Sequence, residues 1–170
     1  DWHVPVGLAG RRNLSSLILG PGPSTWRGCQ PRGLRYLMLL ARKAADVVQV
    51  SGFGLCVREC EFASAWSCSC SDPVLNGIWE TGCRTLSTTM QVHFLDAPDK
   101  DQTQYITYTM IQSWAAYHTF GAYDLAAKSI EEFGRIQFET GELNAVCPSD
   151  LFLHMPDYSL IWPVWLQRHY

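Results

Sequence analysis

The sequence lacks the features of a membrane-spanning or nucleic-acid-binding chain. None of its apolar runs approaches the ~20 residues that a helix needs to cross a bilayer. Its 13 Lys and Arg residues form no basic stripe, and 16 Asp and Glu residues bring the formal net charge to −3 at pH 7. Nucleic-acid surfaces are usually basic. We therefore expect neither a membrane nor nucleic acid as a partner, and the sequence leaves the oligomeric state open.

A targeting signal is also missing. Residues 1–5 include neither an initiator Met nor the charged and apolar segments of a secretory signal. Near the other end, a predicted helix runs up to Tyr170 without a stop signal such as Gly. We therefore expect this chain to be a mature product or part of a longer protein.

The cysteines match no zinc motif. Their number, seven, is odd. Neither the Cys56–Cys60 pair nor the Cys68–Cys70 pair has the second close pair or the spaced His residues of a structural zinc site. Because a free Cys behaves as a small hydrophobe, we predict mostly free thiols, no metal and no other cofactor. The compartment stays open, with free thiols and the lack of a signal favouring the cytoplasm.

The first 68 residues show no helical period. Residues 1–32 form an irregular segment, interrupted by the breaker at 20–23, Gly-Pro-Gly-Pro. Residues 33–68 then contain short apolar runs typical of strands. These runs are Leu34–Leu40, Asp46–Val50, Leu55–Val57 and Glu61–Ala65. A few strands cannot form a stable sheet alone, so we predict that they belong to the end of a larger β domain.

Residues 69–170 have the pattern of packed helices. Asp72 suits an N-cap and Pro73 a first helical position. A stripe at steps of three and four follows, formed by Leu75, Ile78, Trp79, Gly82, Leu86 and Met90. A second helix is predicted from about Thr103 to Phe120, ended by Gly121.

Two more helices are predicted downstream. Asp124 is the expected cap of the third helix. The fourth is expected to start near Ser159, because Pro163 fits best close to a helix start, where its missing N–H removes no i→i−4 hydrogen bond.

The segment His93–Thr103, between the first two predicted helices, carries three carboxylates. Asp96, Asp99 and Asp101 lie in a connection rich in neighbouring aromatic residues. Clustered carboxylates among aromatics suit sugar chemistry, in which one acid protonates a leaving oxygen and others hold hydroxyls. Capping is the alternative: Asp101 followed three residues later by Gln104 resembles a capping box. From the spacing alone, capping is the favoured interpretation.

Several segments from Gly33 onward resemble the α-L-rhamnosidases of glycoside hydrolase family 78. In family order, the matching segments are 33–37, 70–76, 78–79, 85–86, 96–98 with 101–102, 117–121, and 156–160 with 162. The resemblance implies a mainly α fold: the opening helices of an (α/α)₆ toroid, incomplete here, over residues 69–170. It also implies that residues 33–68 are the end of a β-sandwich accessory domain. It does not extend to residues 1–32.

The resemblance further implies an inverting hydrolase that releases terminal α-L-rhamnose from glycans or glycosides. Inverting enzymes use two carboxyl groups roughly 6.5–9.5 Å apart, one as general acid and one as the base that activates water. The base is expected in a later barrel loop, beyond Tyr170. By this interpretation the 170-residue segment alone is inactive.

The family's catalytic loop maps onto this sequence with departures. By position, Asp96 matches the Asp that binds sugar hydroxyls, and Asp101 stands where the general acid Glu is expected. Tyr108 replaces a further Asp, while Ala97 and Lys100 replace Cys and Arg. Asp is one methylene shorter than Glu, and misplacement by about 1 Å can cost on the order of a hundredfold in rate. Tyr108 lacks a charge that would help keep a neighbouring acid protonated.

Four further residues complete the predicted site. Asp157 would bind sugar hydroxyls, Tyr158 and Trp162 would form an apolar wall for the rhamnose methyl group, and His93 would donate to a hydroxyl. Each has a structural alternative: a helix cap for Asp157, barrel packing for Tyr158 and Trp162, and a backbone partner for His93. The alternative function is a catalytically degenerate homologue that binds rhamnosyl carbohydrate or is structural only.

Overall fold

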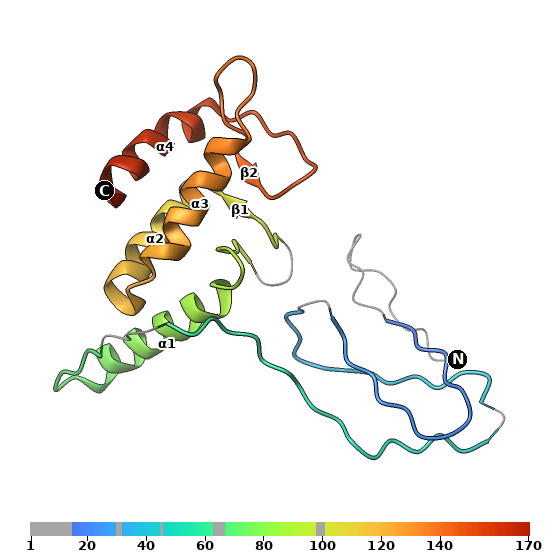
Figure 1. The fold of residues 1–170 in the computed structure, drawn as a ribbon. Helices are drawn as coiled ribbons and strands as arrows, with labels where there is room; N and C mark the ends of the chain where they lie inside the picture. The colour runs from blue at the N-terminus through green and yellow to red at the C-terminus, as the bar shows by residue number, and fades with distance from the viewer. Residues whose placement is uncertain (1–14, 30–31, 45, 63–66, 98–100) are drawn as a thin grey trace. The chain divides into compact units, whose positions relative to one another are not determined.

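The computed structural model describes residues 15–29, 32–44, 46–62, 67–97 and 101–170. The chain divides into two compact units, Asp1–Cys56 and Val57–Tyr170. In the described residues of the first unit, drawn in blue in Figure 1, no helix or strand forms. Apolar side chains there are exposed to solvent, with Tyr36 at 89% and Val47 at 90%.

The strands predicted at Leu34–Leu40, Asp46–Val50 and Leu55–Val57 therefore do not form among these residues, and that prediction was wrong. A strand exists through hydrogen bonds to a neighbour, so an apolar run without a paired partner stays irregular. Most of the run Glu61–Ala65 lies outside the described residues. The assignment of residues 33–68 to a β-sandwich stays a prediction.

Helix α1 spans Pro73–Thr89 and begins as predicted. The Asp72 carboxylate accepts a hydrogen bond of 2.8 Å from the Val74 N–H, which satisfies one of the unpaired donors of the first turn. Only the C-terminal end of the predicted stripe is buried. Leu86 is 9% exposed, whereas Leu75 is 55% exposed. Packing therefore involves the last turns of α1.

Helix α2, Ile106–Phe120, ends as predicted, because Gly121 adopts the left-handed conformation with φ 63°. Its start differs from the prediction. The N-cap is Tyr105, with no side-chain hydrogen bond to the helix. Asp101 thus precedes the helix by several residues, and its interpretation as a capping residue was wrong.

Helices α3, Tyr123–Arg135, and α4, Pro156–His169, also start earlier than expected. Ala122 is the N-cap of α3, and Asp124 lies in the first turn. Helix α4 starts three residues before Ser159 at Pro156, so Pro163 lies inside it. A proline in the first turn is a start signal, since its missing N–H would have no helical acceptor there.

Two short strands join the connections that precede α2 and α4. Strand β1, Gln104–Tyr105, pairs antiparallel with β2, Val146–Cys147. Gln104 is opposite Cys147 and Tyr105 is opposite Val146. Both strands lie after residue 71, in the part that the sequence predicted to be helical.

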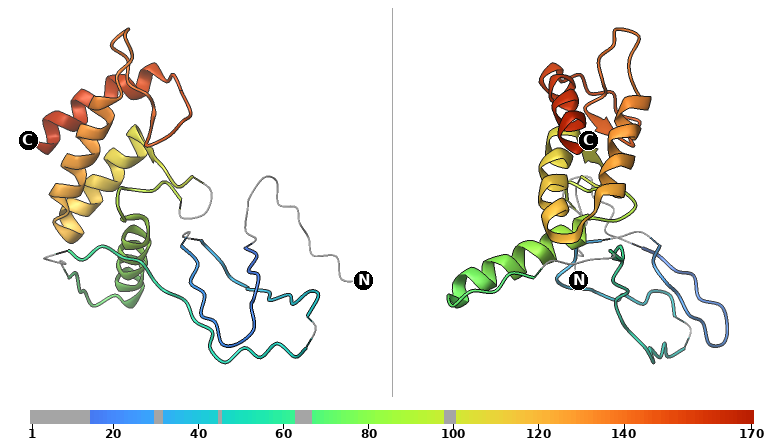
Figure 2. Two further views of the ribbon diagram at one scale, coloured as in Figure 1. Left: turned by 45° about the vertical axis from the view of Figure 1, so that its right-hand side comes forward. Right: turned by 60° about the vertical axis from the view of Figure 1, so that its left-hand side comes forward.

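Helix α2 contacts α1, α3 and α4, and α3 also contacts α4 (Figures 1 and 2). Because α2 and α3 are joined by a tight reversal at Gly121, the start of α2, the end of α3 and the start of α4 lie at one end of the bundle. We call this the loop end. The described part of the second unit is therefore mainly helical, as predicted.

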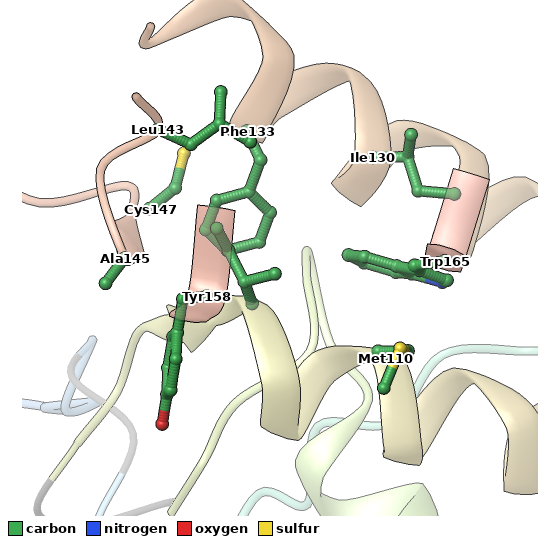
Figure 3. Packing of buried hydrophobic residues seen from close by; sticks show 9 residues of the cluster. Met110, Ile130, Phe133, Leu143, Ala145, Cys147, Tyr158 and Trp165 are labelled. Carbon is green, nitrogen blue, oxygen red and sulfur yellow. The ribbon is translucent and has the colours of Figure 1, made fainter. Parts of the chain in front are cut away.

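The principal core lies between α2, α3 and α4 (Figure 3). Trp165 of α4 is fully buried, and its ring meets Phe133 of α3 edge-on at 6.3 Å between centroids. The other buried members of the cluster are Ile106, Met110, Ile130, Leu143, Ala145, Cys147 and Tyr158. Aromatic burial of this kind dominates the stability of a small core.

We predict that Trp165→Ala lowers the free energy of unfolding by about 3–5 kcal/mol, because it removes a fully buried ring and leaves a cavity. Urea unfolding followed by the far-UV circular dichroism of the helices measures this change. Leu160→Ala in the same helix is the matched control: Leu160 is 75% exposed, so the change should be within about 0.5 kcal/mol. Equal losses in the two variants would contradict the packing described.

Candidate active site at the loop end

The acidic connection between α1 and α2 folds back on itself. Leu95 N–H donates to the Thr89 carbonyl at 2.8 Å, which starts the connection from the last residue of α1. Asp96 N–H donates to the Thr103 carbonyl and Ala97 N–H to the Asp101 carbonyl, each at 3.2 Å. We call residues 92–104 the acidic loop. These bonds place Asp96 and Asp101 on its facing arms, while Asp99 and Lys100 lie outside the described residues.

The acidic loop is attached to the connection between α3 and α4. The Thr103 hydroxyl donates to the Pro148 carbonyl at 2.8 Å, and the Ile106 N–H donates to the Ala145 carbonyl at 3.2 Å. Together with the β1–β2 pairing, these bonds fix the base of the loop against the segment that leads into α4. The candidate site is therefore built from two connections far apart in the sequence.

Three tyrosines line the start of α2 and α4. The Tyr105 and Tyr108 rings lie 5.7 Å apart, and the Tyr108 and Tyr158 rings lie 6.3 Å apart. Figure 3 shows the Tyr158 ring at the edge of the core with its hydroxyl pointing away from the aliphatic side chains. We call these three residues the tyrosine cluster.

Electrostatics connect the carboxylates to this cluster. Burial raises the pKa of Tyr105, and the negative charges of Asp101 and Asp96 raise it further. Burial also raises the pKa of Tyr158, to about 12, with added contributions from Tyr108 and from the charge of Asp157. A charge disfavours a second charge of the same sign only at short range. Three of the predicted site residues, Asp96, Asp101 and Asp157, thus act on the tyrosine cluster, of which Tyr108 and Tyr158 were themselves predicted.

Asp157 is exposed in the first turn of α4. Met155 is the N-cap of that helix and no side chain caps it, so the capping alternative for Asp157 was wrong.

Trp162 packs against α3. Its indole N–H donates to the Ile130 carbonyl at 3.1 Å, and a Cβ added at Gly134 would meet its ring at 3.3 Å. A Cβ at position 134 would therefore require the Trp162 ring to shift by a few tenths of an ångström. This geometry supports the barrel-packing alternative for Trp162.

His93 lies within the acidic loop, where its ring forms a hydrogen bond with the Gln102 backbone. Burial lowers the pKa of His93, and the charge of Glu132 partly opposes this effect. This backbone hydrogen bond agrees with the structural alternative to a sugar-binding role that the sequence left open for His93. His93 thus joins the two arms of the loop.

Sequence reasoning missed Tyr105, Gln104 and Glu132. Tyr105 carried a possible signal as an aromatic residue four positions after Asp101. Gln104 had been considered only as part of a capping box, and it is completely buried. In the sequence, Glu132 has only the i,i+4 spacing from Lys128 that is typical of ion pairs on a helix surface.

Other functions find no support in the described part of the chain. No helix there is both long and apolar enough to span a membrane. Within the same residues, no group of three or more His, Cys, Asp or Glu side chains is placed to hold a metal ion. All seven cysteines are free thiols, of which Cys147 is buried.

The family model of the bacterial alpha-L-rhamnosidase 6 hairpin glycosidase domain matches residues 63–167. This match covers more than half of the chain, which therefore belongs to that family, and its substrate is a carbohydrate. Helices α1, α2 and α3 and most of α4 lie within the matched segment. No curated protein matches the chain, and no solved structure does either.

We predict that alkali destabilises the chain through Tyr158. The folded state raises the pKa of Tyr158 from 10.0 to about 12. The stabilisation that comes from keeping its hydroxyl neutral is therefore present below pH 10 and is lost as the pH rises towards 12. Tyr158→Phe should therefore lose less unfolding free energy between pH 9 and pH 12 than the original chain. Urea unfolding at both pH values measures the difference. An equal loss in both proteins would show that the Tyr158 hydroxyl is not held in its neutral form.

Proposed function

We propose that the loop end forms the rhamnose-binding, acid-bearing part of a glycosidase that releases terminal α-L-rhamnose from glycans or glycosides with inversion. The observation that carries the proposal is the meeting of the acidic loop with the start of α4. Asp96 and Asp101 act on Tyr105, whose ring contacts Tyr108, which in turn contacts Tyr158. Carboxylates beside aromatic rings suit a sugar, which offers both hydroxyls and apolar C–H faces.

Each residue has a distinct role in this proposal. Asp96 and Asp157 accept hydrogen bonds from sugar hydroxyls, since an ionised carboxylate accepts on both oxygens. Tyr158 presents its ring edge and hydroxyl, and Tyr105 extends the aromatic surface. Trp162 is left out because α3 occupies its indole N–H.

Asp101 is the proposed general acid, and Tyr108 supports the site through its hydroxyl. Because Tyr105 is the N-cap of α2, the carboxylate of Asp101 is not used to cap that helix. Asp101 remains one methylene shorter than Glu, so the leaving oxygen must approach the loop more closely. We assign no residue of the described part as the base.

Binding of methyl α-L-rhamnoside to the chain tests the proposal without requiring turnover. We expect Asp96→Asn to weaken binding by about tenfold or more, because a hydrogen bond to a charged group is lost. Titration calorimetry or NMR titration measures the affinity. Methyl α-L-fucoside, a 6-deoxy sugar with differently oriented hydroxyls, should bind more weakly than the rhamnoside.

The matched control is Asp124→Asn. Asp124 lies in the first turn of α3, whereas the last turn of that helix lies at the loop end, so this variant should bind as the original chain does. Failure of the original chain to bind the rhamnoside, or equal weakening by both substitutions, would contradict the proposed site. Binding without turnover of an aryl α-L-rhamnoside by the full-length protein would instead support the degenerate homologue.

A further inference from the structure

The last residue of the acidic loop is a buried polar side chain with a charged partner. Gln104 is fully buried, and its side-chain amide donates to Glu132 Oε2 at 2.7 Å. A buried amide that lost this acceptor would be costly, because desolvation would no longer be compensated. Glu132 of α3 therefore holds the C-terminal end of the loop.

The same carboxylate connects to the N-terminal end of the loop. Glu132 Oε1 pairs with Lys128 Nζ at 3.0 Å, and Lys128 Nζ also donates to the Val92 carbonyl. One ion pair on α3 thus contacts both residue 92 and residue 104. The two carboxylates of the candidate site, Asp96 and Asp101, lie between these two points.

We propose that Lys128 and Glu132 are positioning residues that hold the two ends of the acidic loop at a fixed separation, and so set the places of Asp96 and Asp101. We call this pair the loop clamp. Its consequence for sugar binding rests on the proposed function, whereas its effect on the loop does not. Misplacement of a catalytic group by about 1 Å can cost on the order of a hundredfold in rate. Holding the loop ends at a fixed separation therefore keeps Asp96 and Asp101 in the positions that the site requires.

A comparison within α3 separates the loop clamp from an ordinary surface pair. Glu131 and Arg135 also form an i,i+4 pair at 3.0 Å, but their side chains are 62% and 77% exposed. Glu132 and Lys128 are 26% and 42% exposed. In the exposed pair Glu precedes the cation, the order that favours an isolated helix, whereas the clamp has the reverse order. Helix stability alone does not account for the clamp.

Neighbouring groups confirm that the clamp faces the loop. Both members of the pair act electrostatically on His93, and the His93 ring hydrogen-bonds the Gln102 backbone. They also act on Cys147, which is opposite Gln104 in the β1–β2 pair. The Lys128–Glu132 pair on α3 is thus close to both the acidic loop and β2. His93 adds a cross-connection inside the segment whose ends the clamp holds.

Hydrogen exchange of the intact chain tests the clamp directly. The informative amides are those of Leu95, Asp96 and Ala97, each of which is hydrogen-bonded within the folded connection. Glu132→Gln keeps the shape of the side chain but removes the charge that Lys128 needs. We expect exchange of these amides to become about tenfold faster or more, in line with the loss of a charge-assisted contact. Exchange of Met110, a core residue of α2, should change much less.

Lys128→Met is the second variant and should accelerate exchange of the same amides. Because the partners act as a unit, the double variant should accelerate exchange by no more than the sum of the two single changes. Glu131→Gln is the matched control and should leave the loop amides unchanged. Affinity for methyl α-L-rhamnoside should fall about tenfold or more in Glu132→Gln and in Lys128→Met, and should be unchanged in Glu131→Gln.

Two outcomes would overturn the loop clamp. One is unchanged exchange of the three loop amides in both clamp variants. The other is a parallel rise in Met110 exchange, which would show that the pair contributes only to global stability. If the original chain binds no rhamnoside, the proposed function fails, and the exchange data alone decide the clamp.

Discussion

The antiparallel pairing of β1 with β2 is the constraint on which the candidate site depends. It is only two residues long on each side, too short to be stable alone. It persists because Gln104 and Val146 are buried and the flanking Ile106 N–H bonds to the Ala145 carbonyl. Through this pairing, a loop before α2 and a loop before α4 become neighbours. The Tyr108–Tyr158 pair itself is held by the packing of α2 against α4.

Helix packing and the loop contacts support one another. The core between α2, α3 and α4 brings the start of α2 beside the end of α3, where Glu132 can reach Gln104. In return, the buried Gln104–Glu132 contact specifies how the chain enters α2. A buried polar contact of this kind adds specificity only when its partner is present. The site and the core are thus parts of the same packing arrangement.

The sequence predicted the helices of the second unit well where local chemistry determines the outcome. Asp72 caps α1 and Gly121 ends α2, because an N-cap carboxylate and a left-handed glycine act within a few residues. The periodicity also predicted a mainly helical fold. Predictions failed where the result depends on distant partners: the apolar runs at Leu34–Leu40 form no strand, and Leu75 is exposed.

The site was predictable only in part for the same reason. The roles of Asp96, Asp101, Tyr108, Asp157 and Tyr158 came from the resemblance, and in the structure the three carboxylates act on Tyr105 or on Tyr158 of the tyrosine cluster. The capping interpretation of Asp101 failed because a two-residue strand, which no local signal announces, precedes α2. Nor could spacing reveal that Lys128 and Glu132 face the acidic loop rather than solvent. Such contacts follow from the relative placement of helices, which one sequence does not show.

Amide chemical shifts during titration with methyl α-L-rhamnoside test the central claim most directly, because they locate the sugar on the chain. The account predicts that the perturbed amides fall in three separate segments, at Asp96–Ala97, at Asp101–Tyr108 and at Asp157–Tyr158. Amides near Gly121, at the other end of the bundle, should not move. Perturbations centred on Gly121 or along the exposed face of α1, or confined to only one of the three segments, would contradict a site assembled at the loop end.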